Sequence, residues 1–128
     1  MTGSDPRYLF DPTALERNLA GFDETSRRAM IADLIEELRD RAGAIAAAAG
    51  AGDQEGLELE AYALRSCAAI CGARALIDLS DTLVHSAQGP PGRPQELARV
   101  LRAQVGETLR ALAMWRGGEE RPDREEDE

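Results

Sequence analysis

The segment EAYALRSCAAICGARAL, residues 60 to 76, decides the fold of this chain. Within the segment, Leu64, Ala68 and Cys71 recur at steps of four and three residues, and Leu57 lies seven residues before Leu64. This spacing places all four residues on one face of an α-helix. Gly72 interrupts this pattern, and a second helical pattern begins at Ala73. The segment therefore predicts two helices joined by a very short break.

Two further helices are expected on the N-terminal side. Asp11 is placed to cap a short helix from about Pro12 to Ala20, because an aspartate accepts hydrogen bonds from the free amides of a helix start. Asp23 can cap a long helix of roughly 25 residues. Its apolar residues recur at helical spacing, and they are Met30, Ile31, Leu34, Ile35, Leu38 and Ile45. This helix should end at the glycines of AAAAGAGD, residues 46 to 53.

The C-terminal side predicts the remaining helices. Asp53 opens the helix that runs to Gly72, and the next helix runs from Ala73 to about Ala87. The segment QGPPGRP, residues 88 to 94, ends it because proline cannot continue a helix and glycine favours turns. A last helix from Gln95 to Arg116 carries apolar residues at three- and four-residue steps, namely Leu97, Val100, Leu101, Val105, Leu109 and Leu112.

These patterns indicate an all-α protein, an up-down antiparallel four-helix bundle with a short extra N-terminal helix. Amphipathic helices joined by short breaks bury their apolar stripes most simply in this way. We assign residues 1–10 to an N-terminal extension, residues 11–116 to the bundle and residues 117–128 to a tail. The tail should be disordered and acidic, because GGEERPDREEDE has no apolar residue to bury.

Composition and charge exclude several classes of function. The net charge is −9, which argues against nucleic acid as a partner, because its phosphates need a basic face. The chain has no lysine, which excludes Schiff-base chemistry and a P-loop. No stretch approaches the ~20 apolar residues of a membrane span, and we expect a cytoplasmic protein. Cys67 and Cys71 are expected to be reduced core residues, and no metal or cofactor is predicted.

The central segment resembles the histidine-phosphotransfer (HPt) domain family, whose pattern is close to AHxLKGSAxxxGAxxL. The matching positions are Ala61, Leu64, Arg65, Ala68, Gly72, Ala73 and Leu76, with Arg65 in place of the usual Lys. Ser66 stands where the family favours Gly, and Val84 where it often has an acid. Tyr62 falls at the position of the phosphorylated histidine. The resemblance covers roughly residues 9 to 115 and implies a module of a bacterial two-component phosphorelay.

The resemblance also implies what each residue of the exposed helical face would do. In the family, a neutral imidazole attacks the phosphoaspartate of a receiver domain while a neighbouring Lys or Arg steadies the phosphoryl oxygens. Phenols ionise near pH ~10 and imidazoles near ~6.5, so a phenol is a poor nucleophile at neutral pH. We therefore expect a pseudo-phosphotransfer module that is not an enzyme. It should dock a response-regulator receiver or a sensor histidine kinase domain through Tyr62, Arg65, Ser66 and Ala69.

Other interpretations stay open. His85 is the only histidine, so active histidine phosphotransfer would have to use it, although a histidine near a helix C-terminus more often interacts with the helix dipole. Tyr62 could instead be phosphorylated on its phenol, or be no more than a partly exposed helix residue. The chain could also be a structural helical bundle, for instance a homodimer, with no role in a phosphorelay.

Overall fold

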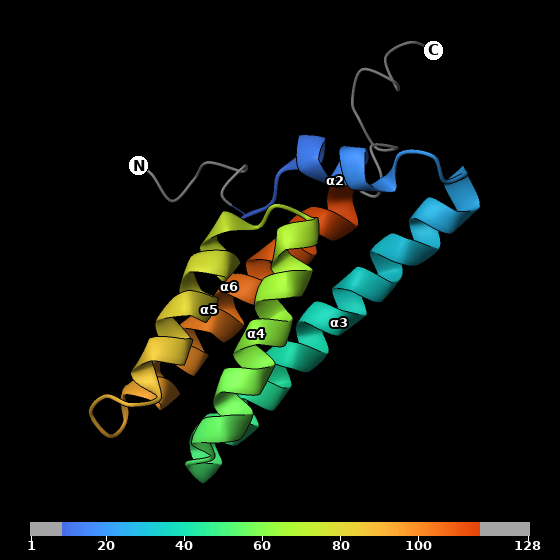
Figure 1. Ribbon diagram of the computed structural model, residues 1–128. Helices are drawn as coiled ribbons and strands as arrows, with labels where there is room; N and C mark the ends of the chain where they lie inside the picture. The colour runs from blue at the N-terminus through green and yellow to red at the C-terminus, as the bar shows by residue number, and fades with distance from the viewer. Residues whose placement is uncertain (1–8, 116–128) are drawn as a thin grey trace.

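The computed structural model describes residues 9–115 and confirms the all-α class (Figure 1). The described part contains a short helix, α2 (Pro12–Leu19), and four long ones, α3 (Glu24–Ala51), α4 (Gln54–Ile70), α5 (Arg74–Ser86) and α6 (Arg93–Trp115). The long helices pack antiparallel in chain order, and α6 closes the ring against α3. The predicted acidic tail and most of the N-terminal extension lie outside the described residues.

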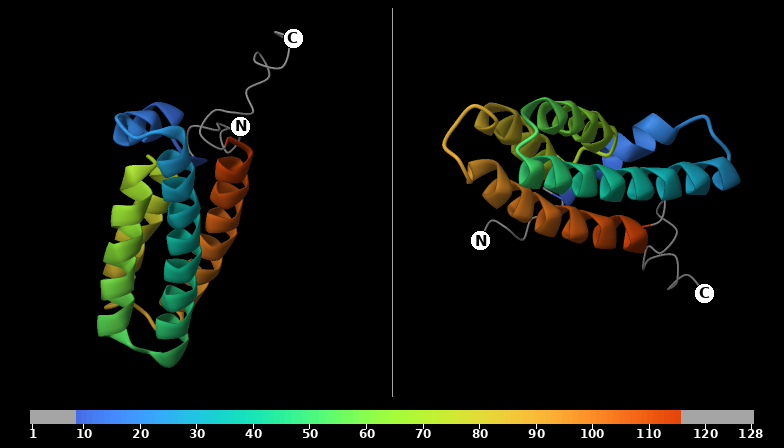
Figure 2. Two further views of the ribbon diagram at one scale, coloured as in Figure 1. Left: turned by 90° about the vertical axis from the view of Figure 1, so that its right-hand side faces the viewer. Right: turned by 90° about the horizontal axis from the view of Figure 1, so that it is seen from below.

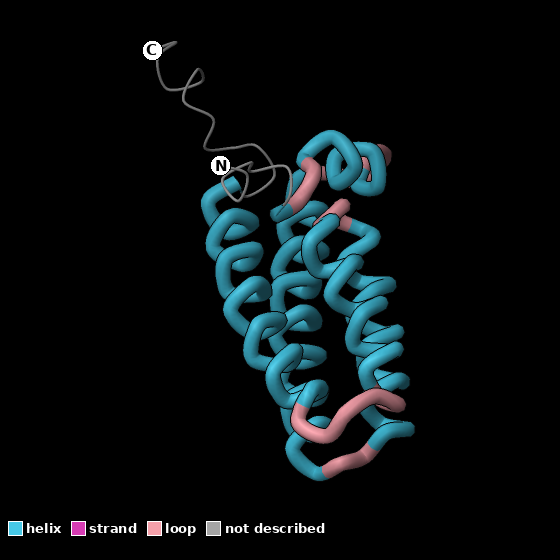
Figure 3. The backbone as a smooth tube through the Cα atoms, turned by 90° about the vertical axis from the view of Figure 1, so that its left-hand side faces the viewer, coloured by secondary structure: helices cyan, strands magenta, loops and turns pink. Residues whose placement is uncertain are grey.

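The helices of the bundle run along one long axis, and α2 lies across one end of them (Figure 2). The connections between the long helices are short and gather at the two ends of the bundle (Figure 3). Within residues 9–115, no helix combines the length and the apolar character that crossing a lipid bilayer requires.

Three aspartates begin helices as the sequence predicts. Asp11 accepts a hydrogen bond from the Thr13 amide at 3.1 Å, Asp23 from the Ser26 amide at 2.7 Å and Asp53 from the Gly56 amide at 3.0 Å. The amide and hydroxyl of Ser26 also hold the pKa of the Asp23 carboxyl below its usual value, because they stabilise the carboxylate. Each cap satisfies an amide that the helix leaves unpaired, which fixes where the chain turns.

Helix α3 ends at the glycines, as predicted: it continues through Gly50 to Ala51, and Gly52 caps it in the left-handed conformation with φ of 71°. One helix start differs from the prediction. Helix α6 begins at Arg93 and not at Gln95. Pro94 therefore lies inside the first turn of α6, where the missing amide hydrogen costs no helical hydrogen bond.

One hydrophobic core runs through the bundle, and every helix contributes to it. The largest fully buried leucines are Leu15, Leu38, Leu57, Leu64, Leu76, Leu83, Leu101 and Leu112. The sequence predicts Val100 on the apolar face of α6, but this prediction is wrong, since Val100 is 51% exposed. The neighbouring Leu97, Leu101 and Val105 occupy the inner stripe of α6, and Val100 lies on the outer side. Trp115 packs edge-on against Phe10, with ring centroids 5.8 Å apart.

The turn between α4 and α5 is fixed against α2. The amide of Asp11 donates to the carbonyl of Cys71 at 2.8 Å, and Asn18 Nδ2 donates to the carbonyl of Ile70 at 2.7 Å. Gly72 has φ of 63°, and a Cβ atom there would lie 2.7 Å from the Cβ of Asp11. Only glycine therefore fits this position without displacing α2.

Candidate functional site

The outer face of α4 presents the residues that the sequence singles out. Tyr62, Arg65, Ser66 and Ala69 are all exposed, and the ring of Tyr62 is 56% exposed. The Ser66 hydroxyl donates to the Tyr62 carbonyl at 3.2 Å, so it is engaged with its own helix. We call the exposed residues of this side the α4 face, which comprises Leu59, Tyr62, Arg65, Ser66, Ala69 and Ile70.

Leu59 and Ile70 belong to the α4 face and are not among the docking residues predicted from the sequence. Leu59 is 69% exposed and Ile70 is 45% exposed. Both lie outside the buried stripe that contains Leu64 and Ala68. Their position away from this stripe is the feature of the sequence that could have predicted their exposure. Of the six large apolar side chains exposed within residues 9–115, α4 therefore carries three.

Arg65 is ion-paired across the helix interface. Its Nε lies 2.8 Å from Oδ1 of Asp81 on α5, and both side chains are about half exposed, at 47% and 48%. An exposed pair of this kind is worth about 0–1 kcal/mol. The pair nevertheless joins α4 to α5 and places an acid beside the guanidinium, which offsets part of its positive charge.

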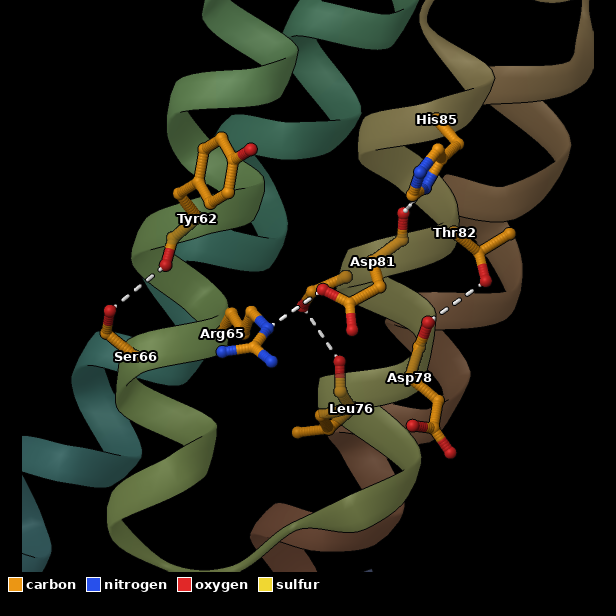
Figure 4. A network of polar contacts seen from close by, with 9 residues as sticks. Tyr62, Arg65, Ser66, Leu76, Asp78, Asp81, Thr82 and His85 are labelled. Carbon is orange, nitrogen blue, oxygen red and sulfur yellow. Dashed lines mark hydrogen bonds and ion pairs between the residues drawn. The ribbon is translucent and has the colours of Figure 1, made fainter.

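His85 lies on the same side of the molecule as Tyr62 (Figure 4). Helices α4 and α5 are antiparallel and Arg65 faces Asp81, so one turn along both helices brings His85 level with Tyr62. The exposed His85 ring donates from Nδ1 to the Asp81 carbonyl at 2.8 Å. A carbonyl only accepts, so Nδ1 carries the hydrogen, and in the neutral ring Nε2 keeps its lone pair. Tyr62 and His85 are far apart in the sequence, so their position on the same side of the molecule could not be predicted from it.

An apolar groove opens between α2, α3 and α4 beside the α4 face. Its volume is about 340 Å³, and its lining consists of Leu15, Leu19, Met30, Ile31, Asp33, Leu34, Glu37, Cys67 and Ile70. Ile70 belongs both to the groove and to the α4 face. The groove could not be predicted from the sequence, because its walls come from three separate helices.

The two cysteines, Cys67 and Cys71, are buried and free. Desolvation raises the pKa of the Cys71 thiol to about 12 and that of the Cys67 thiol to about 11, with the nearby Glu37 carboxylate adding to the latter shift. Both thiols are therefore protonated at neutral pH, and a nucleophilic role is disfavoured. Among the described residues, no three potential metal-ligating side chains gather at one place.

A second cavity, of about 330 Å³, lies at the opposite end of the bundle among the helix ends and the loop between α5 and α6. Here the Gln54 side-chain amide donates to the Ala87 carbonyl, and Gln95 Nε2 donates to the Ala49 carbonyl at 2.9 Å. Carbonyl groups at helix C-termini lack partners within their own helix. Gln54 supplies such a partner for Ala87, and Gln95 adds a second donor to the Ala49 carbonyl, which also accepts from the Gly52 amide at 3.3 Å. The two glutamines thus join helix ends at the closure of the bundle.

The α4 face thus combines an exposed phenol, a paired guanidinium and apolar side chains, next to an imidazole and a groove. This arrangement is suited to protein binding, because aromatic and apolar groups with a polar rim are typical of interfaces. Comparisons of the chain with protein-family models, with curated proteins and with solved structures give no match.

Proposed function

We propose that this chain is an HPt-like docking module of a bacterial two-component phosphorelay. In this proposal the α4 face binds a response-regulator receiver domain or a sensor histidine kinase domain, and Tyr62 carries no phosphate. The observation that supports it most directly is the half-exposed Tyr62 ring on a helix that also exposes Leu59 and Ile70. Exposed apolar side chains gathered on one side of a protein commonly mark a surface that a partner covers.

The surroundings of Tyr62 favour binding over phosphoryl transfer. Phenols are overwhelmingly protonated at neutral pH, so Tyr62 lacks the ready lone pair of an imidazole. Arg65, which the resemblance places next to the phosphoryl group, already has Asp81 as a partner at 2.8 Å. An acid at this position would repel a phosphoryl group. The module would then act by occupying or sequestering its partner, which needs no chemical step.

We expect Tyr62→Ala to weaken the binding of a cognate receiver or kinase domain by roughly 30-fold, because aromatic residues at the centre of an interface often contribute about 2 kcal/mol or more. The measurement is a titration of a panel of receiver and kinase domains, followed by calorimetry and by NMR shifts of the α4 residues. Val100→Ala is the matched control, since Val100 is similarly exposed, at 51%, but lies on α6.

The control should leave the affinity unchanged within about twofold, because an exposed residue outside an interface contributes little. If no domain of the panel shifts the signals around Tyr62, or if Val100→Ala weakens binding as much as Tyr62→Ala does, the docking proposal is wrong. A bundle with a purely structural role would then be the better interpretation.

One observation favours a second candidate function, which is phosphotransfer through His85. The Nδ1 hydrogen bond to Asp81 leaves Nε2 as the nucleophilic nitrogen, on the same side as Arg65. In such a step Nε2 would bond to the phosphorus of a receiver's aspartyl phosphate while the phosphorus–oxygen bond to the aspartate breaks. Nδ1 would keep its hydrogen, and the Asp81 carbonyl would stabilise the charged ring.

For this second candidate we expect labelled phosphate to pass from a phosphorylated receiver domain to the chain, and the label to vanish with His85→Ala. Tyr62→Phe serves as the control, because it removes the phenol hydroxyl and keeps the ring. Label that survives His85→Ala but is lost with Tyr62→Phe would assign the phosphate to the phenol. An unlabelled wild-type chain would leave docking without transfer as the function.

A further inference from the structure

Another groove, of about 190 Å³, lies between the C-terminal half of α3 and the N-terminal half of α6, which pack side by side (Figure 2). We call it the α3–α6 groove. Neither of its two arginines has an ion pair within residues 9–115, and Glu96, the acid nearest to them along α6, already pairs with Arg93. Most of the lining residues are small and the two charged ones are arginines: Ala46, Ala49, Gly50, Ala98, Arg99 and Arg102.

The α3–α6 groove differs in charge from two other grooves of the molecule. The charged residues that line the apolar groove between α2, α3 and α4 are acids, Asp33 and Glu37. A third groove, further along α3 and α6, is lined by Arg28, but this arginine lies in an ion pair with Glu24 at 3.1 Å. Of these three grooves, the α3–α6 groove therefore attracts an acidic segment most strongly.

The chain itself carries an acidic segment after α6. Residues 117–128 lie outside the described part, and their sequence contains seven acids and two arginines, a net charge of −5. Gly117 and Gly118 come first, and glycine adopts backbone conformations that let a chain reverse its direction. We propose that residues 119–128 fold back along α6 and that their carboxylates pair with Arg99 and Arg102 in the α3–α6 groove.

The segment is long enough to reach the two arginines. Arg102 and Arg99 lie thirteen and sixteen residues before Trp115, the last residue of α6. These separations correspond to about 20 and about 24 Å along the helix axis, at about 1.5 Å per residue. An extended chain spans about 3.3 Å per residue, so about seven residues after Trp115 cover the return to Arg99. Asp123 and the acids that follow it therefore reach both arginines.

Attachment to α6 makes a contact built from weak ion pairs effective. A single exposed ion pair contributes little by itself. A segment joined to the helix by a short linker, however, has an effective concentration at the groove on the order of millimolar, and several of its acids compete for the same two arginines. Helix α6 packs on α3 and α5 and so lies diagonally across the bundle from α4. The contact thus leaves the α4 face accessible and does not depend on the proposed docking function.

The test uses the full chain with a nitroxide spin label attached at Glu125→Cys. Cys67 and Cys71 are buried and protonated at neutral pH, so the reagent should modify the introduced cysteine, and the unmodified wild type checks this. We expect the NMR amide signals of Gly50 and Ala98, which we call the groove signals, to lose most of their intensity. The signal of Leu59, on α4, should keep its intensity. Equal intensities for the groove signals and Leu59 would overturn the proposal.

Charge reversal at the groove is the decisive variant. Arg99→Glu together with Arg102→Glu should restore the groove signals, because two attractions become repulsions. Arg17→Glu together with Arg74→Glu is the matched control, since it changes the net charge by the same amount at exposed arginines outside the groove. The control should keep the loss of intensity. Equal recovery in both double variants would overturn the proposal, because the contact would then depend on net charge alone.

Salt and mixing complete the test. About 1 M salt shortens the Debye length to about 3 Å and should restore the groove signals, whereas a loss that persists would contradict ion pairing. A mixture of spin-labelled chain without isotopes and isotope-labelled chain without the nitroxide should keep the groove signals. Their loss in the mixture would assign the contact to a second copy and overturn the proposal. None of these outcomes bears on the receiver titration, which depends on Tyr62.

Discussion

Leu64→Ala should lower the free energy of unfolding by about 2–5 kcal/mol, whereas Leu59→Ala on the same helix should change it by less than about 0.5 kcal/mol. Leu64 is 0% exposed in the centre of the bundle, and Leu59 is 69% exposed. Removing the Leu64 side chain loses buried apolar contacts and leaves a cavity that the surrounding helices fill only in part. Urea denaturation followed by far-UV circular dichroism measures both values.

The two leucines make a matched pair, because the same side chain is removed from the same helix and only burial differs. Similar losses of stability in the two variants would show that Leu59 is covered, by another segment of the chain or by a second copy. The α4 face would then be unavailable for the docking that we propose. A small loss for Leu64→Ala would contradict the position of α4 in the core.

Gly72→Ala should lower the free energy of unfolding by about 2–4 kcal/mol, and Gly52→Ala by only about 1–2 kcal/mol. Both glycines adopt left-handed backbone conformations, with φ of 63° and 71°, so alanine strains both. A Cβ at Gly52 would meet nothing within 4 Å, whereas one at Gly72 would meet the Cβ of Asp11 at 2.7 Å and that of Ala14 at 3.3 Å. The difference between the two variants therefore measures the close approach of α2.

Thermal and urea denaturation of the two glycine variants provide the comparison. Equal losses would mean that α2 moves away from the α4–α5 turn at little cost. In that case the hydrogen bond from Asp11 to Cys71 would contribute little to the position of α2.

The sequence predicts the parts of this fold that are encoded locally. The aspartate caps and the glycines at helix ends are read from neighbouring residues, and the structure places the helix starts where Asp11, Asp23 and Asp53 indicate. The prediction for Val100 is wrong because apolar residues at three- and four-residue steps cover a wider part of the helix surface than the part of α6 that is buried. The spacing of apolar residues alone does not show which of them are exposed to solvent.

Features that depend on the packing of distant segments could not be read in the same way. The ion pair of Arg65 with Asp81, and the position of His85 on the same side of the molecule as Tyr62, depend on the register of two antiparallel helices. That register is set by the tight turn at Gly72, whose contact with α2 is itself non-local. The exposed position of Tyr62 followed from helix periodicity, but the groove beside it required three helices to be placed together.

Helices α3 and α4, which both line the apolar groove, differ in length. Helix α3 has 28 residues and α4 has 17, so α3 extends beyond its neighbour by roughly 16 Å at 1.5 Å per residue. Helix α2 lies across this end of the bundle (Figure 1). Lengthening α4 by one turn would move the α4–α5 turn, and with it the contact of Gly72 and Cys71 with Asp11. The length of α4 and the position of α2 are therefore coupled.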